Sequence, residues 1–132
     1  FELMSERLAV ALESGDQEDE QSCFSDNTHH DFIYDVLGIR NCYFGVAPGQ
    51  PGVGALVAAK DVALHGKLVA AFDQLDRNLA QLPVPFDQVL ASPKESPQRV
   101  VAQQVVKDLG ALTDLLRAVG PVLHIQVVVS GE

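Results

Sequence analysis

The sequence predicts an all-α protein, folded as an antiparallel four-helix bundle. Three features carry this prediction: apolar residues recur at helical spacing in four segments, glycine and proline stand where these segments end, and the connecting loops are modest in length. The 132 residues suffice for one hydrophobic core, so we expect residues 1–132 to form a single domain. Hydrophobic residues make up 47% of the chain and charged residues 20%, which is an ordinary globular balance.

The first two predicted helices lie in the N-terminal third of the chain. One runs from about residue 1 to residue 13, and Gly15 is placed to end it. The other begins near Thr28, where Asp26, Asn27 or Thr28 itself is suited to cap the first turn. Each helix has one apolar face. These faces are Met4, Leu8, Ala11 and Leu12 in the first helix and Phe32, Val36, Ile39 and Tyr43 in the second.

Two longer helices are expected in the second half, after a glycine- and proline-rich loop at 45–54 and a short helix at 55–60. The third bundle helix covers about 61–81, and Pro83 follows it. A further helical turn is expected at 86–90. The fourth bundle helix has Ser96 as N-cap and Pro97 in the first helical position, and Gly120 with Pro121 is expected to end it. The β-branched tail at 125–129 is expected to be extended.

Charge and composition exclude several classes of protein. The net charge of −9 argues against a nucleic acid partner, because binding phosphates requires a basic face. No apolar run reaches the roughly 20 residues of a membrane-spanning helix. The chain opens inside an amphipathic segment, so we expect it to begin within a longer protein. Two cysteines are too few for a disulfide scaffold.

The most informative segment is the polar stretch at 16–27, which holds five acidic residues with Cys23 and Phe24 among them. A solvated loop has little use for an aromatic residue at that place. We therefore expect Phe24 to pin the loop to the core while the polar side chains around it point into a shared pocket. His29 and His30 follow at the start of the next helix.

These residues resemble the second signature of the imelysin-like proteins, a family that includes the insulin-cleaving metalloproteinases and the cyanobacterial iron-regulated protein A. The resemblance rests on Glu6-Arg7, on the acidic run at 16–20, on the long and specific run at 22–29, and on Asp31. The segments 38–41 and 43–45 also resemble the family. Beyond Val46 the similarity is limited to the helix pattern and the Pro85-Phe86-Asp87 turn.

The resemblance implies a two-lobed, all-helical protein in which this chain is the C-terminal lobe. Its partner would be an N-terminal lobe or a second copy. Family members are exported to the periplasm or the outer membrane, often as lipoproteins, and some respond to iron. The metallopeptidase classification rests on a GxHxxE motif in the first lobe, and no such motif occurs here. Gln21 also replaces the histidine of the family's Glu-His-Ser-Cys run, and an amide is a poor ligand for transition metals.

The resemblance also implies a site, in which we expect a divalent metal ion, iron or zinc, that this chain alone holds weakly. Oxygen donors suit hard cations, and an imidazole adds affinity for iron or zinc. No catalytic residue is assigned. The expected metal ligands are His29, Glu20 and Asp19, and the expected cleft-lining residues are Ser22, Cys23, Ser25, Asp26, Asn27, Glu6 and Arg7.

A structural interpretation competes at most of these positions. Asp26 or Asn27 would cap the next helix, and the hydroxyls of Ser22 and Ser25 would bond backbone amides. An internal ion pair between Glu6 and Arg7 would orient the loop. His29 is the best single ligand candidate, because its neighbour His30 is expected to face another direction.

The remaining histidine and cysteine positions carry structural expectations. His65 lies on an apolar stripe, so it is expected to be a core or interface residue with one bonded nitrogen. Cys23 and Cys42 are expected to stay unbonded, because the helix between them is about 20 Å long. Cys23 would be buried beside Phe24, and Cys42 would pack near Tyr43.

Two functions follow from the sequence. The first is a metal-binding accessory or uptake domain of an exported imelysin-like protein. The alternative is a fragment of an imelysin-type metallopeptidase whose main ligands lie in a missing N-terminal lobe. We favour the first, because the acidic segment is present and a catalytic motif is absent from the sequence.

Overall fold

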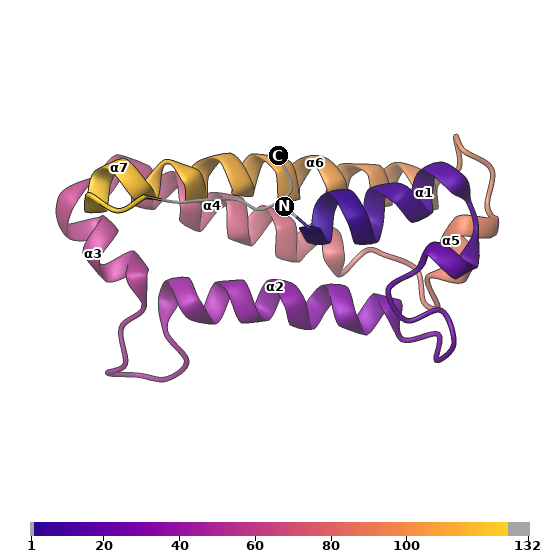
Figure 1. The fold of residues 1–132 in the computed structure, drawn as a ribbon, viewed down its shortest axis with the longest axis horizontal. Coiled ribbons are helices and arrows are strands. Elements are labelled where there is room, and N and C mark those ends of the chain that lie inside the picture. The colour runs from indigo at the N-terminus through magenta and orange to yellow at the C-terminus, as the bar shows by residue number, and fades with distance from the viewer. Residues whose placement is uncertain (1, 127–132) are drawn as a thin grey trace.

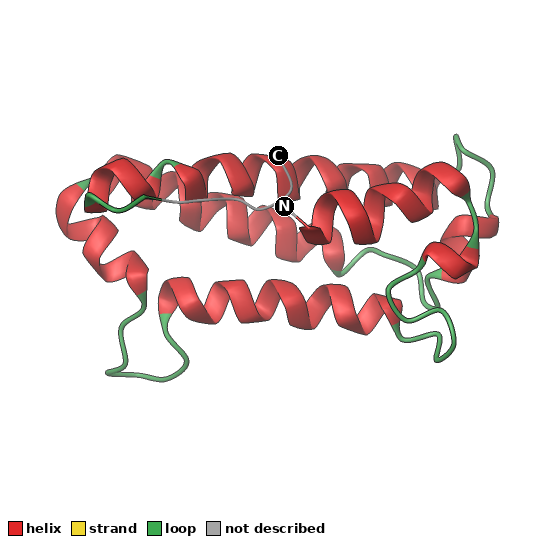
Figure 2. Cartoon of the chain, in the orientation of Figure 1, coloured by secondary structure: helices red, strands yellow, loops and turns green. Residues whose placement is uncertain are grey.

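The computed structural model describes residues 2–126, and every regular element in that range is helical (Figures 1 and 2). The all-α class predicted from the sequence is therefore confirmed. None of these helices is long and apolar enough to cross a membrane. The elements are η1 (Leu3–Ala9), α1 (Val10–Ser14), η2 (Gln17–Asp19), α2 (Thr28–Phe44), α3 (Val53–Lys60), α4 (Val62–Leu79), α5 (Asp87–Ala91), α6 (Pro97–Arg117) and α7 (Val119–Leu123).

The centre of the fold is the pair α4 and α6, which lie side by side and run in opposite directions (Figure 1). The η1–α1 segment packs against α6, and α2 runs along the other side of the molecule. The buried apolar residues of the pair recur every three or four positions, as expected for amphipathic helices. They are Leu64, Leu68, Phe72, Leu75 and Leu79 on α4 and Ala102, Val105, Leu109 and Leu112 on α6.

Phe72 sits at the middle of this core and is fully buried. Its ring contacts those of Tyr43 and Phe44, with centroids 5.6 and 5.3 Å away, so it joins the end of α2 to α4. Burying a phenylalanine contributes about 1.5–3 kcal/mol through removal of its surface from water. Replacing Phe72 by alanine would cost about 3–5 kcal/mol, because a cavity would remain.

Tyr43 also holds His65 in place. The Tyr43 hydroxyl lies 3.0 Å from His65 Nδ1, and the two rings stack with centroids 5.9 Å apart. Burial raises the pKa of Tyr43, so its hydroxyl stays protonated and able to donate. The prediction that His65 is a packed residue with one bonded nitrogen is confirmed.

Several helices begin or end at the capping residues that the sequence contains. Ser96 accepts a hydrogen bond from the Arg99 amide at 3.2 Å, and Pro97 occupies the first turn of α6, as predicted. Asp61 accepts from the Leu64 amide at 2.8 Å and so caps α4. Gly15 ends α1 with φ of +70°, a left-handed conformation that glycine adopts without strain.

The first helix ends before Gly15 as predicted, although Leu3–Ala9 within it is a π-helix that continues into α1. One predicted boundary is wrong. Gly120 and Pro121 do not end the last helical segment; they lie inside α7, which follows α6 directly. Proline is tolerated there because amides of a first helical turn lack partners within the helix. Of the predicted extended tail, Ile125 and Gln126 have no regular structure, and 127–129 lies outside the described residues.

Candidate functional site

The segment between α1 and α2 is held by its own polar side chains. Asp16 Oδ1 accepts from the Glu18 amide at 3.0 Å, and Gln17 Nε2 donates to Asp26 Oδ1 at 2.9 Å. Asp26 has φ of +52°, a left-handed conformation that aspartate tolerates better than most residues. The acidic run therefore folds back on itself before α2 begins.

Ser22 attaches this segment to the first turn of α2. Its amide donates to Thr28 Oγ1 at 3.2 Å, and its hydroxyl makes a short hydrogen bond to Asp31 Oδ2. Ser25 Oγ donates to the Ser22 carbonyl at 3.3 Å. The serines thus staple the loop, but the prediction that they bond backbone amides is wrong, since both hydroxyls donate to oxygen.

Side-chain capping of α2 by Asp26 or Asn27 is also not found. Asn27 is the N-cap residue, but its side chain makes no capping bond; its carbonyl accepts from the amides of His30 and Asp31. Asp26 is already engaged by Gln17. Thr28 does not cap the helix either; it is fully buried, and its hydroxyl accepts the hydrogen bond from the Ser22 amide.

Phe24 does not pin the loop. Its side chain is 100% exposed, so that prediction is wrong. The buried positions near it belong to Glu20 and Thr28, and the intervening turn carries Phe24 outward. Cys23 is half-buried and lines a shallow pocket of about 190 Å³ together with Phe24, so it is not buried as expected.

Both cysteines are free, which confirms the prediction that Cys23 and Cys42 are not bonded. Cys42 lies exposed near the end of α2, and Cys23 precedes the start of that helix. The length of α2 therefore separates the two thiols, as the sequence indicated.

Glu20 is the acidic residue of this segment that the fold buries. It is only 6% exposed, and its Oε1 has no hydrogen-bond partner among the described residues. Burial raises the pKa of Glu20, a hydrogen bond with the Thr28 side chain lowers it, and the carboxylates of Asp87 and Asp26 raise it further. The pKa of Glu20 therefore ends above its ordinary value of 4.5.

Asp87 belongs to the same acidic region although it comes from α5, far along the chain. Its Oδ1 is buried and likewise lacks a partner among the described residues. Sequence reasoning did not name Asp87 as a site residue. The sequence did contain a signal for Asp87, because the Pro85-Phe86-Asp87 turn resembles the family. No functional role had been given to that turn.

His29 is half-buried at the start of α2, and its buried Nδ1 has no partner among the described residues. Burial lowers the pKa of His29, the neighbouring His30 lowers it further, and Asp31 opposes both. The neutral imidazole that results is the form that binds metals. The expectation that His30 faces elsewhere is wrong: the two ring centroids are 4.2 Å apart.

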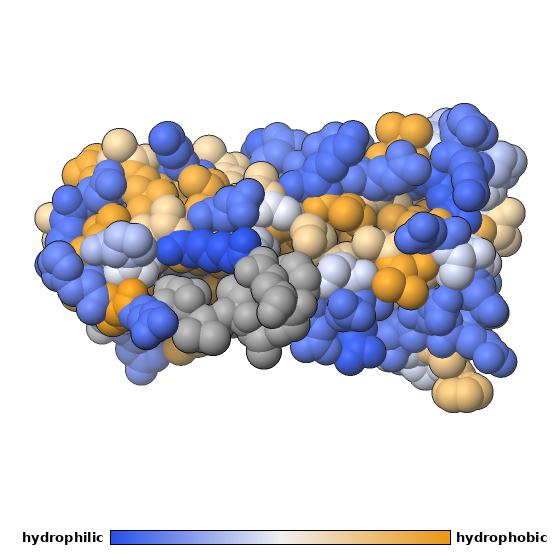
Figure 3. Space-filling view, turned by 45° about the horizontal axis from the view of Figure 1, so that its top comes forward, coloured by the Kyte–Doolittle hydropathy of each residue, from blue (hydrophilic) through white to orange (hydrophobic). Residues whose placement is uncertain are grey.

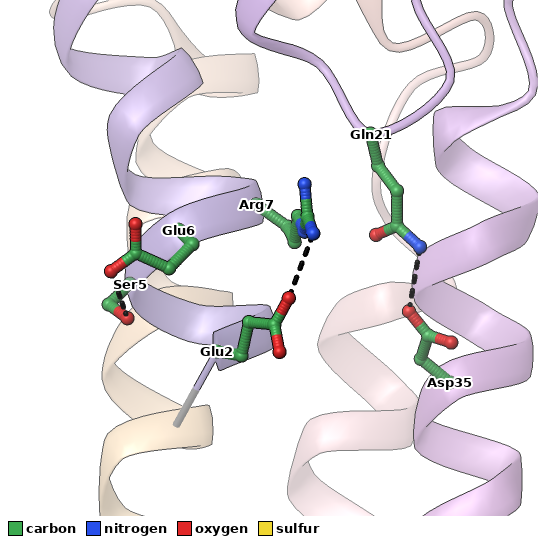
Figure 4. A network of polar contacts seen from close by, with 6 residues as sticks. All are labelled: Glu2, Ser5, Glu6, Arg7, Gln21 and Asp35. Carbon is green, nitrogen blue, oxygen red and sulfur yellow. Dashed lines mark hydrogen bonds and ion pairs between the residues drawn. The ribbon is translucent and has the colours of Figure 1, made fainter. Parts of the chain in front are cut away.

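A polar groove of about 560 Å³ lies between η1 and α2. Arg7 and Glu2 point into it from one side, with Arg7 Nη2 2.8 Å from Glu2 Oε1 (Figure 4). On the other side Gln21 Nε2 donates to Asp35 Oδ2 at 3.0 Å, and Gln21 Oε1 is buried without a partner among the described residues. The sequence interpretation named Arg7 but missed Glu2 and Asp35.

Glu6 does not join this groove. It points away from Arg7, toward Ser5, whose hydroxyl donates to Glu6 Oε1 at 3.3 Å (Figure 4). The predicted ion pair between Glu6 and Arg7 is therefore wrong. Here Glu6 is turned toward Ser5, whereas Glu2 lies about one turn before Arg7 and within its reach.

The candidate ligands do not assemble into a closed set. Asp19 is exposed, Glu20 is buried and His29 is half-buried. Within residues 2–126, no three side chains of histidine, cysteine, aspartate or glutamate come close enough together to hold a metal ion. Ser25 and Asn27 lie in the turn that precedes α2, and both are exposed.

The sequence of the chain matches the family model for imelysin, peptidase family M75, over residues 1–116. This match covers most of the chain. The chain belongs to the imelysin family. No curated protein sequence matches it. In this imelysin-family chain the matched region includes the acidic segment, the η1–α2 groove and Asp87.

Proposed function

We propose that this imelysin-family chain is the C-terminal lobe of a two-lobed protein of the periplasm or outer membrane, and that it binds a metal ion, iron being favoured. The η1–α1 segment, α2, α4 and α6 would together form one antiparallel bundle. This bundle would present the acidic segment to a second lobe. The chain supplies part of the metal's ligand shell, and the second lobe supplies the rest.

One observation carries the proposal: Glu20 places an unpartnered carboxylate oxygen in a buried position beside a second carboxylate, Asp87. Buried polar atoms are normally hydrogen-bonded, and the neighbouring carboxylate of Asp87 disfavours the ionised form of Glu20. A cation relieves both costs at once. Carboxylate oxygens are the donors that hard cations prefer.

The other unpartnered atoms fit the same interpretation. His29 Nδ1 is a donor that iron and zinc accept, and Gln21 Oε1 lies in the η1–α2 groove beside Asp35. Together with Glu20, these residues would supply an incomplete ligand shell for the metal ion. Binding by this chain alone is therefore expected to be weak and to strengthen when a second lobe closes over the groove.

Exposed apolar residues on the outer surface of α2 favour a second lobe as a partner of this chain. Ile33, Tyr34 and Leu37 are 43%, 65% and 43% exposed, although they stand on a helix whose other face is packed. Adjacent apolar residues of this size rarely stay uncovered, so we propose that an N-terminal lobe or a second copy of this chain covers them.

Equilibrium dialysis against Fe²⁺ and Zn²⁺ tests the proposal, with the chain alone and with an N-terminal imelysin lobe added. We expect weak binding that increases with the added lobe and that falls in Glu20→Gln and His29→Ala. Glu18→Gln and His30→Ala are the matched controls, and they should fall less.

Three results would count against the proposal. Binding that is equal in Glu20→Gln and the wild type would remove Glu20 from the site. A stoichiometric metal that survives dialysis against a chelator in this chain alone would contradict the incomplete shell. Peptide hydrolysis that depends on the added lobe and stops with a chelator would favour the metallopeptidase alternative.

A further inference from the structure

A second pocket, of about 360 Å³, lies between α1 and α6 and shares no lining residue with the polar groove. This volume falls within the range of small-molecule sites, roughly 300–1,000 Å³. Most of its exposed lining is apolar, and Ala9, Leu12 and Val106 supply apolar walls. On the face drawn in Figure 3, apolar residues also come to the surface between hydrophilic ones.

The charges around this pocket differ from those of the rest of the chain. The protein has 18 acidic residues and nine basic ones, for a net charge of −9. Three of the nine basic residues, Lys94, Arg99 and Lys107, line this one pocket, and Glu13 is the acidic residue on its lining. The pocket is therefore a positive region on an acidic protein.

Arg99 gives the pocket a fixed, buried positive charge. Its side chain is 4% exposed, and its guanidinium donates to the carbonyls of Leu12 at 2.6 Å and Leu90 at 2.7 Å, with a longer bond to Ser92 at 3.4 Å. These carbonyls lie at or just beyond the C-terminal ends of α1 and α5, where helices leave acceptors unpaired. Within residues 2–126, Arg99 forms no ion pair with a carboxylate. Arginine stays charged in proteins, so this charge persists.

The two lysines stand free at the same site. Lys94 and Lys107 are exposed, and neither forms an ion pair with another described residue. Their ammonium groups are therefore available to an incoming anion, and a lysine stem packs against apolar surface while its charged end stays accessible.

We propose that this pocket binds a small organic anion, a medium-chain carboxylate whose apolar tail lies against Ala9, Leu12 and Val106. Its carboxylate would face Lys94 and Lys107, in the field of Arg99. The pocket suits such a ligand in both respects, because burial of the tail removes apolar surface from water and the carboxylate meets unpaired cations. This site is separate from the proposed metal site in residues and in chemistry.

Isothermal titration of the full 132-residue chain with decanoate, below its micelle concentration, tests the proposal. Decanol and decyltrimethylammonium are the matched probes, since they carry the same tail with no charge and with a positive charge. We expect decanoate to bind at one molecule per chain, decanol at least about tenfold more weakly, and the cation not at all.

The lysines provide the second arm of the test. Lys107→Glu should weaken decanoate binding by about tenfold or more, because attraction becomes repulsion. Lys67→Glu is the control, since Lys67 is exposed on α4 and outside the pocket. Circular dichroism checks that both variants keep their helices. Decanoate binding that equals decanol binding, that is absent, or that is unchanged in Lys107→Glu would overturn the proposal.

Discussion

Gln21 and Asp35 face each other in the groove between η1 and α2, and Gln21 Nε2 lies 3.0 Å from Asp35 Oδ2 (Figure 4). Gln21 belongs to the acidic segment and Asp35 to the second turn of α2. In the Glu-His-Ser-Cys run that residues 20–23 resemble, histidine stands at the position of Gln21. A carboxylate beside a histidine fixes its tautomer and raises its basicity as a ligand, and Asp35 is placed to do this.

The first prediction restores that histidine. Gln21→His should raise the affinity for Zn²⁺ about tenfold over the wild type, because it adds an imidazole that Asp35 orients. Isothermal titration with Zn²⁺ near pH 7 measures the change. The double variant Gln21→His, Asp35→Asn should lose most of the gain. An equal gain in both variants would show that Asp35 does not orient residue 21.

The second prediction concerns stability and pH. Because burial raises the pKa of Glu20, the folded protein binds a proton there more readily than the unfolded chain does. The stability that protonation of Glu20 contributes is fully present below the ordinary pKa of 4.5 and is lost as pH rises through the higher folded value. Glu20→Gln imitates the protonated form, so it should be more stable than the wild type at pH 7.

Thermal unfolding at a series of pH values measures this difference. The advantage of Glu20→Gln should shrink as the pH falls and vanish below about pH 4, with each unit of pKa elevation worth about 1.4 kcal/mol. Glu18→Gln, on the exposed side of the same segment, should show no such pattern. Glu20→Gln less stable than wild type at pH 7 would mean that an unseen cation or donor holds the ionised carboxylate.

The third prediction concerns the outer surface of α2. Because Ile33, Tyr34 and Leu37 are exposed together, this chain alone should associate into dimers as its concentration rises. Sedimentation equilibrium measures this association. The double variant Tyr34→Glu, Leu37→Glu should be monomeric, whereas Val62→Glu, at an exposed position on α4, should still associate. A wild-type chain that stays monomeric at high concentration would contradict the proposed covered face.

The fourth prediction concerns Arg99. Arg99→Met should destabilise the fold by about 2 kcal/mol or more, because two carbonyls at short distance lose a charged donor and become unpaired. Urea unfolding measures the loss. Arg77→Met, on the exposed side of α4, should change stability by less than about 0.5 kcal/mol. Equal effects of the two substitutions would show that Arg99 does not hold the ends of α1 and α5.

Several elements were determined by the sequence alone. The α-helical class followed from the 3.6-residue periodicity, and the start of α6 followed from Ser96 and Pro97, because a cap and a proline act within one turn. His65 and the unbonded cysteines were also predicted correctly, since both depended on spacing along a helix. The run at 22–29 indicated the imelysin family, and the match over residues 1–116 confirms that family.

The burial of polar residues was decided by tertiary structure. Phe24 was expected to be buried and is fully exposed, whereas Glu20, expected to be a ligand in a cleft, is buried beside Thr28 and the distant Asp87. Side-chain polarity gives the average cost of burial, but which residue is buried depends on the path of the backbone and on groups contributed by α5. The partner of Arg7 was likewise decided by the register of η1, which turns Glu2 toward it and Glu6 away.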